Sequence, residues 1–388
     1  MQLSTKQFRF AGKGERGELA QQLGTIRPYK DMIGPWRRWA GDEGVEDNHE
    51  HPDHPANYRA SDDLVDAVNT AIAIGKPLLL TGNPGTGKSQ LAERIAWEFN
   101  LGPVLRFEAQ SLSEANDLFY RFDLVGHLSA VQLYQSALKF DKHSELSNHL
   151  RSAPKEVAPE KYVKIGPLGA AILRSRPATY HNMFDAVFGP AEQAATTEAR
   201  PSVVLIDEID KASRDFPNDL LNGIERLEFT VRELGMGTLS VNPELRPIVI
   251  ISSNSERDLP PAFLRRCTFF HIPDPSEAEL EQIIAQKFFR SDAGNGADSP
   301  HALKLPVFYR QLLASFMQFR ADNEDGLQYR PGTAEIINWT DALLRRGASA
   351  EVELVEQLEA VRRTTTTVSK HRDDQLSLAD FLNGLKPA

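Results

Sequence analysis

The sequence contains very little cysteine, since Cys267 is the single one among 388 residues. One thiol leaves no intramolecular disulfide and fits a reducing compartment. No apolar run approaches the roughly 20 residues that span a bilayer. The start, MQLSTKQFRF, also has no secretory apolar segment. We therefore expect a cytoplasmic protein that does not use a membrane.

The sequence also lacks a net basic charge. Lys and Arg number 44 against 54 Asp and Glu, which gives a net charge of -10. This balance argues against a generally basic surface for nucleic acid, although a local basic channel is compatible with it. We do not expect nucleic acid as a partner, but we do not exclude it. The length suits two domains with extra segments.

Residues 1–57 are rich in Gly, Pro, Arg and acidic residues and show weak periodicity, so we expect an extended or partly ordered segment. Two clusters within this segment have a functional alternative. HEHPDH (residues 49–54) lies in a proline-broken acidic stretch, which favours a solvated segment over a metal site. PWRRW (residues 35–39) has the composition to stack on bases, but we favour anchoring of the segment to the main domain.

An α/β domain is predicted over about 58–273. It opens with the helix SDDLVDAVNTAIAIG, for which Ser61 is a suitable N-cap and Gly75 a stop. The short apolar strand KPLLLTG follows, then a glycine-rich loop and the helix QLAERIAWEFN with an apolar stripe. PVLRFEA, SVVLIDEID and RPIVIISSN are further apolar runs, each typical of a strand in a parallel sheet that is covered on both faces.

Between the second and third strands lie about 90 residues, more than one crossover helix needs. We expect a helical insertion there, at about 127–200, with helices at SAVQLYQSALKF and PLGAAILRS. LEFTVRELGMGTLSV, before the last strand, predicts a β-hairpin. It either projects toward a pore or partner, or simply extends a sheet.

Beyond HIPDPSEAEL the sequence predicts helices only, which make a smaller helical lid domain over 274–363. We expect residues 364–388 to form a C-terminal tail in which TTTT is a surface linker before a short helix, LSLADFLNG. The four helices of the lid are expected at 276–290, 306–321, 333–346 and 349–363.

The loop GNPGTGKS has the spacing of a phosphate cradle between a strand and a helix. Its glycines let backbone N–H groups face phosphate oxygens, Lys88 reaches the β and γ phosphates, and the Ser89 hydroxyl binds Mg²⁺. The alternative is a glycine-rich turn with a surface lysine. The predicted nucleotide-binding residues are Gly82, Asn83, Pro84, Gly85, Thr86, Gly87, Lys88, Ser89 and Gln90.

Acidic residues follow the strand VVLID directly. Asp207 at its end is placed to bind Mg²⁺ opposite Ser89, and Glu208 to polarise a water for attack on the γ phosphate. An acidic turn after a buried strand is the alternative. Asn254 ends the next apolar strand, where it is able to hydrogen-bond the attacking water or the γ phosphate; an asparagine turn is the alternative.

LPPAFLRRC places Arg265 and Arg266 at the end of a short proline-started helix. Such a pair does not easily reach its own γ phosphate, but it is able to act as a finger in the site of a neighbouring subunit. Alternatively, the pair binds helix carbonyls or carboxylates.

In this order, the loop, the Asp-Glu strand end, the asparagine strand, the arginine pair and the helical lid resemble the AAA+ ATPases. IGPLGAAIL, LIDEIDKASRDFPNDLLNGIERLEF and SSNSERDLPPAFLRRC are similar to the MoxR-type branch, and the similarity covers about 58–345. The resemblance implies a P-loop three-layer αβα core with a parallel sheet, followed by a smaller all-helical lid. It also implies ATP and Mg²⁺ as ligands.

The resemblance assigns further roles by position. Arg266 matches the arginine that acts on a neighbouring subunit, while Arg265 replaces the usual aspartate. Gly332 of YRPGTAEIINW falls where the family's lid arginine contacts nucleotide, so Arg330 is the candidate substitute. A finger that acts in trans implies a homo-oligomeric ring, expected to be a hexamer.

The leading hypothesis is an ATP-hydrolysing ring that remodels a protein client. The resemblance adds a von Willebrand factor A protein as partner. The alternative is a nucleic-acid-stimulated motor, or a nucleotide-gated component of a restriction or defence system. A P-loop kinase, the third possibility, needs neither Glu208 nor Asn254.

Overall fold

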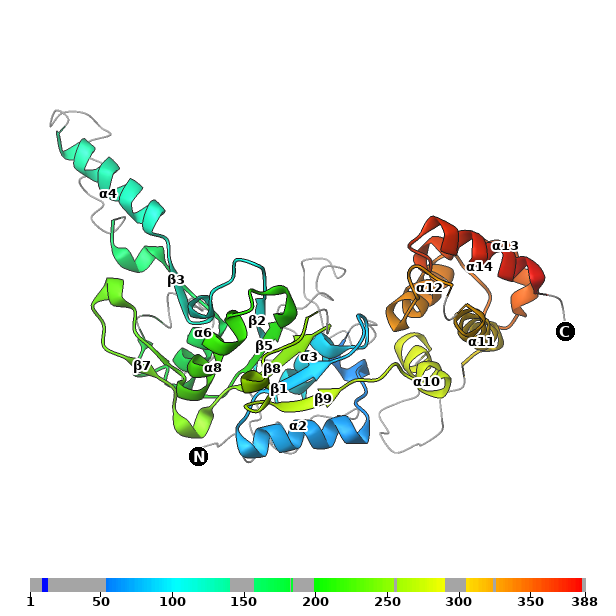
Figure 1. The fold of residues 1–388 in the computed structure, drawn as a ribbon, viewed down its shortest axis with the longest axis horizontal. Coiled ribbons are helices and arrows are strands. Elements are labelled where there is room, and N and C mark those ends of the chain that lie inside the picture. Colours follow the sequence, from blue (N-terminus) through cyan, green and yellow to red (C-terminus); the bar gives the residue numbers. More distant parts are fainter. Residues whose placement is uncertain are drawn as a thin grey trace.

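Figure 1 shows the fold in a computed structural model. In the part of the chain that it describes, no helix is long and apolar enough to cross a bilayer. PWRRW and all of HEHPDH except its last histidine lie outside the described residues. That histidine, His54, is buried, and its Nδ1 accepts a hydrogen bond of 3.1 Å from the Ala56 amide, so it caps a short turn. The described residues are 9–12, 54–139, 157–181, 183, 199–254, 257–289, 305–323 and 326–385.

The centre of the molecule is a five-stranded parallel sheet in the order β2-β5-β8-β1-β9, which confirms the predicted parallel α/β core. Four strands match the predicted apolar runs. The fifth, β9, was not predicted; TFFH alternates in burial at one edge of the sheet, as LRFE of β2 does at the other edge. The strands are β1 (Leu78–Thr81), β2 (Leu105–Glu108), β5 (Val203–Asp207), β8 (Ile248–Ser253) and β9 (Thr268–His271).

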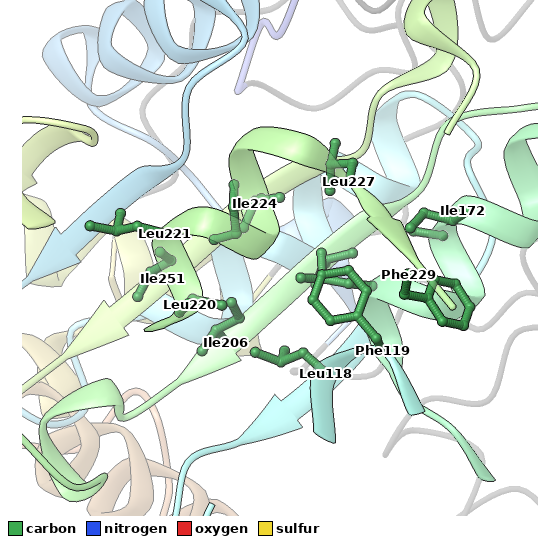
Figure 2. Close-up of a cluster of buried hydrophobic side chains, with 14 of the residues drawn as sticks. Leu118, Phe119, Ile172, Ile206, Leu220, Leu221, Ile224, Leu227, Phe229 and Ile251 are labelled. Carbon is green, nitrogen blue, oxygen red and sulfur yellow. The ribbon is translucent and has the colours of Figure 1, made fainter. Parts of the chain in front are cut away.

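One face of the sheet is covered by α6 (Pro167–Ser175) and α8 (Phe216–Arg226). Figure 2 shows the apolar core between these layers, in which Ile206 and Ile251 of the sheet lie near Leu220 of α8. Helix α8 contributes a full apolar stripe to this core. Burial of that stripe holds β5 and β8 in the middle of the sheet.

The other face is covered by α2 (Asp62–Ile74) and α3 (Lys88–Glu98). Successive residues of a strand point to opposite faces. Leu205 and Ile250, each next to a residue of the first core, therefore lie in this second core. Strands buried on both faces need a continuous apolar sequence, which is why these strands could be predicted from the sequence. Gly75 ends α2 as expected, in the left-handed conformation with φ 68°.

The insertion between β2 and β5 contains an antiparallel pair, β3 (Tyr120–Phe122) and β4 (Val163–Ile165). Strands of three residues leave no periodic signal, so this pair was not predicted. The helix expected at SAVQLYQSALKF is α4 (Leu124–Lys139), which is longer at its start and extends away from the sheet (Figure 1). Its exposed large apolar side chains are Leu124, Val125, Leu128 and Leu133.

The predicted hairpin is confirmed as β6 (Glu228–Phe229) paired antiparallel with β7 (Leu239–Ser240). Phe229 is buried in the core beside α6 and α8, so the base of the hairpin packs on the layer that covers the sheet. After β8 comes the one-turn helix α9 (Pro261–Leu264). Among the described residues, the short 3₁₀ turns of the α/β part are η4 (Pro55–Asn57), η5 (Ala115–Leu118), η7 (Pro159–Tyr162), η8 (Ile209–Lys211), η9 (Arg232–Leu234) and η10 (Pro243–Leu245).

The C-terminal part is helical and has its own apolar core, which includes Phe308, Phe316 and Trp339. The first three predicted helices are present, whereas the fourth is a 3₁₀ turn followed by a short helix. The elements are α10 (Glu277–Phe288), α11 (Val307–Asp322), α12 (Thr333–Arg345), η11 (Leu354–Gln357), α13 (Leu358–Arg362), η12 (Thr365–Thr367) and α14 (Arg372–Gly384).

The structure differs from the expected surface linker at TTTT. Thr364 is 3% exposed, and its hydroxyl accepts a hydrogen bond of 2.8 Å from Trp339 Nε1. The same hydroxyl donates to the Val361 carbonyl, so the threonine is buried with its polar group satisfied. Leu378 and Leu382 of α14 then pack in the helical core. The expected tail is therefore part of the helical domain over its described residues.

Candidate active site

The glycine-rich loop runs from the end of β1 to the first turn of α3. Its three glycines have positive φ: 146° at Gly82, 83° at Gly85 and 86° at Gly87. A Cβ at Gly82 would lie 2.5 Å from the Ile272 carbonyl oxygen, and the other two positions are similarly tight. Only glycine fits these positions, so the loop folds tightly over the N-terminus of α3, where N–H groups without helical partners favour anions.

Lys88 is the first residue of α3 and is almost completely buried. Its Nζ donates to the carbonyl oxygens of Gly82 at 2.8 Å and Asn83 at 2.9 Å. Burial lowers the pKa of Lys88, and the nearby charges of Asp207, Asp210 and Glu208 oppose this shift. The ammonium group therefore lies inside the loop, among acceptors that a phosphate oxygen is able to replace.

Ser89 lies opposite the acidic end of β5. Its hydroxyl donates to Asp207 at 2.8 Å (Oδ2) and 3.1 Å (Oδ1), and the Ser252 hydroxyl of β8 also donates to Asp207. No cluster of three or more His, Cys, Asp or Glu suited to a metal occurs among the described residues. Mg²⁺ usually takes one or two protein ligands together with phosphates and waters, so a hydroxyl beside one carboxylate fits this ion.

Glu208 has a backbone conformation that is unusual for a residue other than glycine, with φ 56° and ψ 49°. Its amide donates to the Ser252 hydroxyl at 2.9 Å, which helps to hold this turn. Two neighbours bind the Glu208 carboxylate: Asn254 Nδ2 at 3.2 Å and Lys211 Nζ at 2.5 Å.

Three residues of this network were not predicted from the sequence. Ser252 contacts both Asp207 and the Glu208 amide, Asp210 accepts a hydrogen bond from the Asn254 amide at 3.1 Å, and Lys211 pairs with Glu208. The one sequence feature that could have pointed to these three residues is their position, since all three lie within three residues of a predicted site residue. Serine, aspartate and lysine at the end of a strand are too common to stand out.

The arginine pair lies outside this network. Arg266 is exposed, and its Nε pairs with Glu225 Oε1 of α8 at 2.9 Å. Arg265 is exposed as well and ends α9. An exposed ion pair contributes about 0–1 kcal/mol, so the contact with Glu225 is easily exchanged for another partner.

The lid meets the phosphate loop at the start of α12. A Cβ at Gly85 would lie 2.8 Å from the Ala334 methyl, and one at Gly332 would lie 3.9 Å from the Pro84 carbonyl oxygen. Arg330 is exposed and lies two residues before Gly332, in the segment that leads to this contact. Thr86 bonds the Asn83 carbonyl at 2.9 Å, and Gln90 is an exposed residue in the first turn of α3.

Most of the predicted catalytic residues are thus brought together at the carboxyl ends of β1, β5 and β8. Ser89 bonds Asp207 and Glu208 bonds Asn254, and the charges of Asp207 and Glu208 act on the nearby Lys88 ammonium. Arg266 instead lies in an ion pair with α8.

One family of known proteins matches the part of the chain that holds this site. No curated protein matches the chain. A solved structure described as "Structure of C. elegans PCH-2" is similar at 15% identity and a TM-score of 0.33; the match covers 76% of this chain and 62% of that chain. Residues 78–273, just over half of the 388, match the family described as "ATPase family associated with various cellular activities (AAA)". The chain therefore belongs to the AAA family of ATPases.

Proposed function

We propose that the protein hydrolyses ATP to ADP and phosphate, with Mg²⁺, at the site built from the phosphate loop and the ends of β5 and β8. The observation that carries this proposal is the hydrogen bond between Glu208 and Asn254, with Asp207, the residue before Glu208, bonded to Ser89. A carboxylate in that place is able to activate a water beside a bound triphosphate. Transfer to a second substrate would not need it.

The phosphate loop and the end of β5 bind the triphosphate and its metal ion in this proposal. The triphosphate lies in the glycine-rich loop, and Lys88 exchanges the carbonyls of Gly82 and Asn83 for β and γ phosphate oxygens. Ser89 and Asp207 hold Mg²⁺. When bound, this ion neutralises charge on the β and γ phosphates.

Glu208 accepts a proton from the attacking water while Asn254 orients the water or the γ phosphate. The water oxygen bonds to the γ phosphorus, the bond from that phosphorus to the bridging oxygen breaks, and ADP leaves with the electron pair. The ion pair between Glu208 and Lys211 competes with the water for one carboxylate oxygen. Exchange of that partner is therefore part of the catalytic cycle that we propose.

We also propose that Arg266 completes the site of a neighbouring subunit in a homo-oligomeric ring, with six subunits as the expected number. Its support is the position of Arg266, exposed and apart from the phosphate site of its own chain. An arginine that reaches the γ phosphate from outside stabilises charge in the transition state. Arg265, also exposed, is a weaker candidate for the same role.

For the biological role we propose MoxR-type, chaperone-like remodelling of a protein client, with a von Willebrand factor A partner, in the cytoplasm. The exposed apolar side chains of α4 support a protein client, since apolar patches of this kind commonly contact other proteins. A net charge of -10 favours this role over a nucleic-acid motor.

The experiment that tests the reaction follows products. Purified protein with ATP and Mg²⁺ is expected to release ADP and phosphate in equal amounts, with no phosphorylated product, and EDTA is expected to stop the release. Absence of turnover at several protein concentrations would contradict the proposal, because ring formation depends on concentration. Stimulation by DNA or RNA with a steep salt dependence would favour the nucleic-acid role instead.

A further inference from the structure

Asp274 connects the phosphate loop to the helical domain. It lies between β9 and α10, in the segment that joins the two parts of the protein. Its Oδ1 accepts a hydrogen bond of 2.9 Å from Asn83 Nδ2 of the loop. Its Oδ2 accepts one of 3.0 Å from Arg320 Nη2 of α11. One carboxylate therefore holds a side chain from each part.

The lid side of this bridge is anchored in the helical core. Arg320 is 6% exposed, and its guanidinium lies 5.8 Å from the centre of the Phe316 ring. Its Nε has no hydrogen-bond partner. A buried guanidinium depends strongly on each partner that it has, because water does not replace a lost one. A shift of Asp274 therefore changes the position of Arg320 in α11.

The loop side of the bridge is next to the lysine that binds phosphate. The Asn83 carbonyl accepts hydrogen bonds of 2.9 Å from Lys88 Nζ and from the Thr86 hydroxyl. Its side chain bonds Asp274. The backbone of Asn83 thus contacts Lys88 and its side chain contacts Asp274. A change at Lys88 is able to reach Asp274 through this single residue.

We propose that the bridge Asn83–Asp274–Arg320 transmits occupancy of the phosphate loop to the helical domain, with Asp274 as the positioning residue. This proposal rests on the proposed function for the identity of the ligand, ATP. When Lys88 turns to phosphate oxygens, the Asn83 carbonyl loses one donor and the loop peptide adjusts. Asp274 follows the Asn83 amide, and α11 follows Asp274 through Arg320.

Other contacts between the two parts are less suited to this task. Gly332 and Ala334 of α12 meet the loop through backbone and a methyl group, which carry no directional charge. Arg59 reaches Gln282 of α10 at the longer distance of 3.4 Å, compared with 2.9 Å for the Asn83–Asp274 hydrogen bond. The bridge, in contrast, joins a charged pair that is largely buried on the lid side to a residue in direct contact with Lys88.

The test measures movement of the lid in the full-length chain when ATP is added. Dyes on Asp63→Cys and Glu356→Cys, both at exposed positions, report the distance between α2 and the helical domain by energy transfer; Cys267→Ser removes the native thiol. Glu208→Gln in all samples keeps ATP intact, so the response does not depend on turnover. ATP is expected to change the transfer in the parent protein, and Asn83→Ala and Asp274→Ala are each expected to reduce that change by about threefold or more.

The double variant Asn83→Ala with Asp274→Ala is expected to lose no more than Asp274→Ala alone, because both act through one bridge. Asp341→Ala is the matched control. It also breaks an Asp–Arg pair in the lid, with Arg345, but that pair does not involve the loop. The control is expected to respond as the parent does.

Asp274→Ala leaves a buried guanidinium with one partner fewer, and this variant is at risk of not folding. Asn83→Ala is the safeguard, since it keeps the Asp274–Arg320 pair and changes only an exposed loop side chain. A full response in folded Asn83→Ala would overturn the proposal, and so would a parent protein whose lid does not respond to ATP. Phosphate release by the protein without Glu208→Gln is measured separately; its absence would contradict the ATPase and leave the lid measurement valid.

Discussion

Glu208 and Asn254 are 46 residues apart in sequence and meet through a hydrogen bond of 3.2 Å between Oε1 and Nδ2. They follow β5 and β8, which are neighbours in the parallel sheet. Because parallel strands end at the same edge, polar residues just after them converge there. This contact places a candidate catalytic carboxylate beside a candidate water-orienting amide.

Replacement of the carboxylate should separate binding from chemistry. Glu208→Gln keeps the size of the side chain and a hydrogen-bond acceptor for Asn254, but it removes the proposed proton acceptor. We expect ATP binding to persist while turnover falls by about 10²- to 10⁴-fold. Equilibrium binding of a fluorescent ATP analogue and phosphate release measure the two effects. Near-normal turnover would remove Glu208 from the catalytic role.

Lys88→Met should abolish ATP binding, because the methionine has no charge for the β and γ phosphates. Lys164→Met, at an exposed lysine of β4, is the control.

The variants Lys88→Met and Lys164→Met also test the pKa of Lys88. Burial lowers the pKa of Lys88, so the folded state binds fewer protons than the unfolded state as pH approaches the ordinary lysine pKa.

Stability from this group is therefore expected to rise with pH in that alkaline window. Without ATP, the melting temperature of the parent protein relative to Lys88→Met should increase from pH 8 to pH 10. A constant difference across that range would contradict the lowered pKa. Lys164→Met, compared in the same way, should show no such trend.

A shared active site predicts complementation between inactive subunits. Arg266→Ala removes the proposed finger and is expected to lower turnover by about 10³-fold or more. Mixed with Glu208→Gln subunits, it should regain part of the activity, since some sites then combine an intact Glu208 with an intact Arg266. Co-assembly is checked by affinity pull-down of differently tagged chains. Mixed oligomers that stay inactive would count against a finger in trans.

Ser252 was not predicted, and its contacts give it a positioning role. Ser252→Ala removes a donor to Asp207 and leaves the Glu208 amide without its acceptor. We expect a loss of about 1–3 kcal/mol in the free energy of unfolding together with a lower turnover number. Ser175→Ala is the matched control, because Ser175 is equally buried and bonds the Ile172 carbonyl away from the site. Equal turnover in the two variants would show that Ser252 is structural only.

The C-terminal packing is tested with Thr364→Val, which keeps the shape of the side chain. The Trp339 Nε1 group would then be buried without an acceptor, at a cost of about 1–3 kcal/mol in the free energy of unfolding. Thr366→Val, at an exposed position in the same run, should change stability little. Chemical denaturation measures both. Equal stabilities would indicate that residues after 363 do not contribute to the helical domain in solution.

The strands that could be predicted are those that leave an apolar pattern in the sequence. Continuous apolar runs predicted β1, β5 and β8, because both faces of these strands are covered. PVLRFEA also predicted β2, although this edge strand alternates in burial. The three-residue pair of β3 and β4 and the edge strand β9 lack such a signal. They form because partners distant in sequence supply their hydrogen bonds.

The threonine run shows the limit of composition. Four successive threonines indicate a surface linker when read alone, yet Thr364 is buried against Trp339. Local composition does not record that a turn at this point lets hydroxyls bond backbone carbonyls and lets α14 close the core. Tertiary packing overrides the local preference.

The sequence by itself determined the glycine-rich loop, the positions of the apolar strands along the chain, and the acidic and amide residues that follow them. These features depend on local backbone geometry and on neighbours along the chain, which a sequence displays directly. Only the tertiary structure decided that Ser252 and Lys211 bind the acidic pair and that Arg266 pairs with Glu225 of α8. It likewise decided that Asp274 joins Asn83 to Arg320, because contacts between residues far apart in sequence depend on how the layers pack.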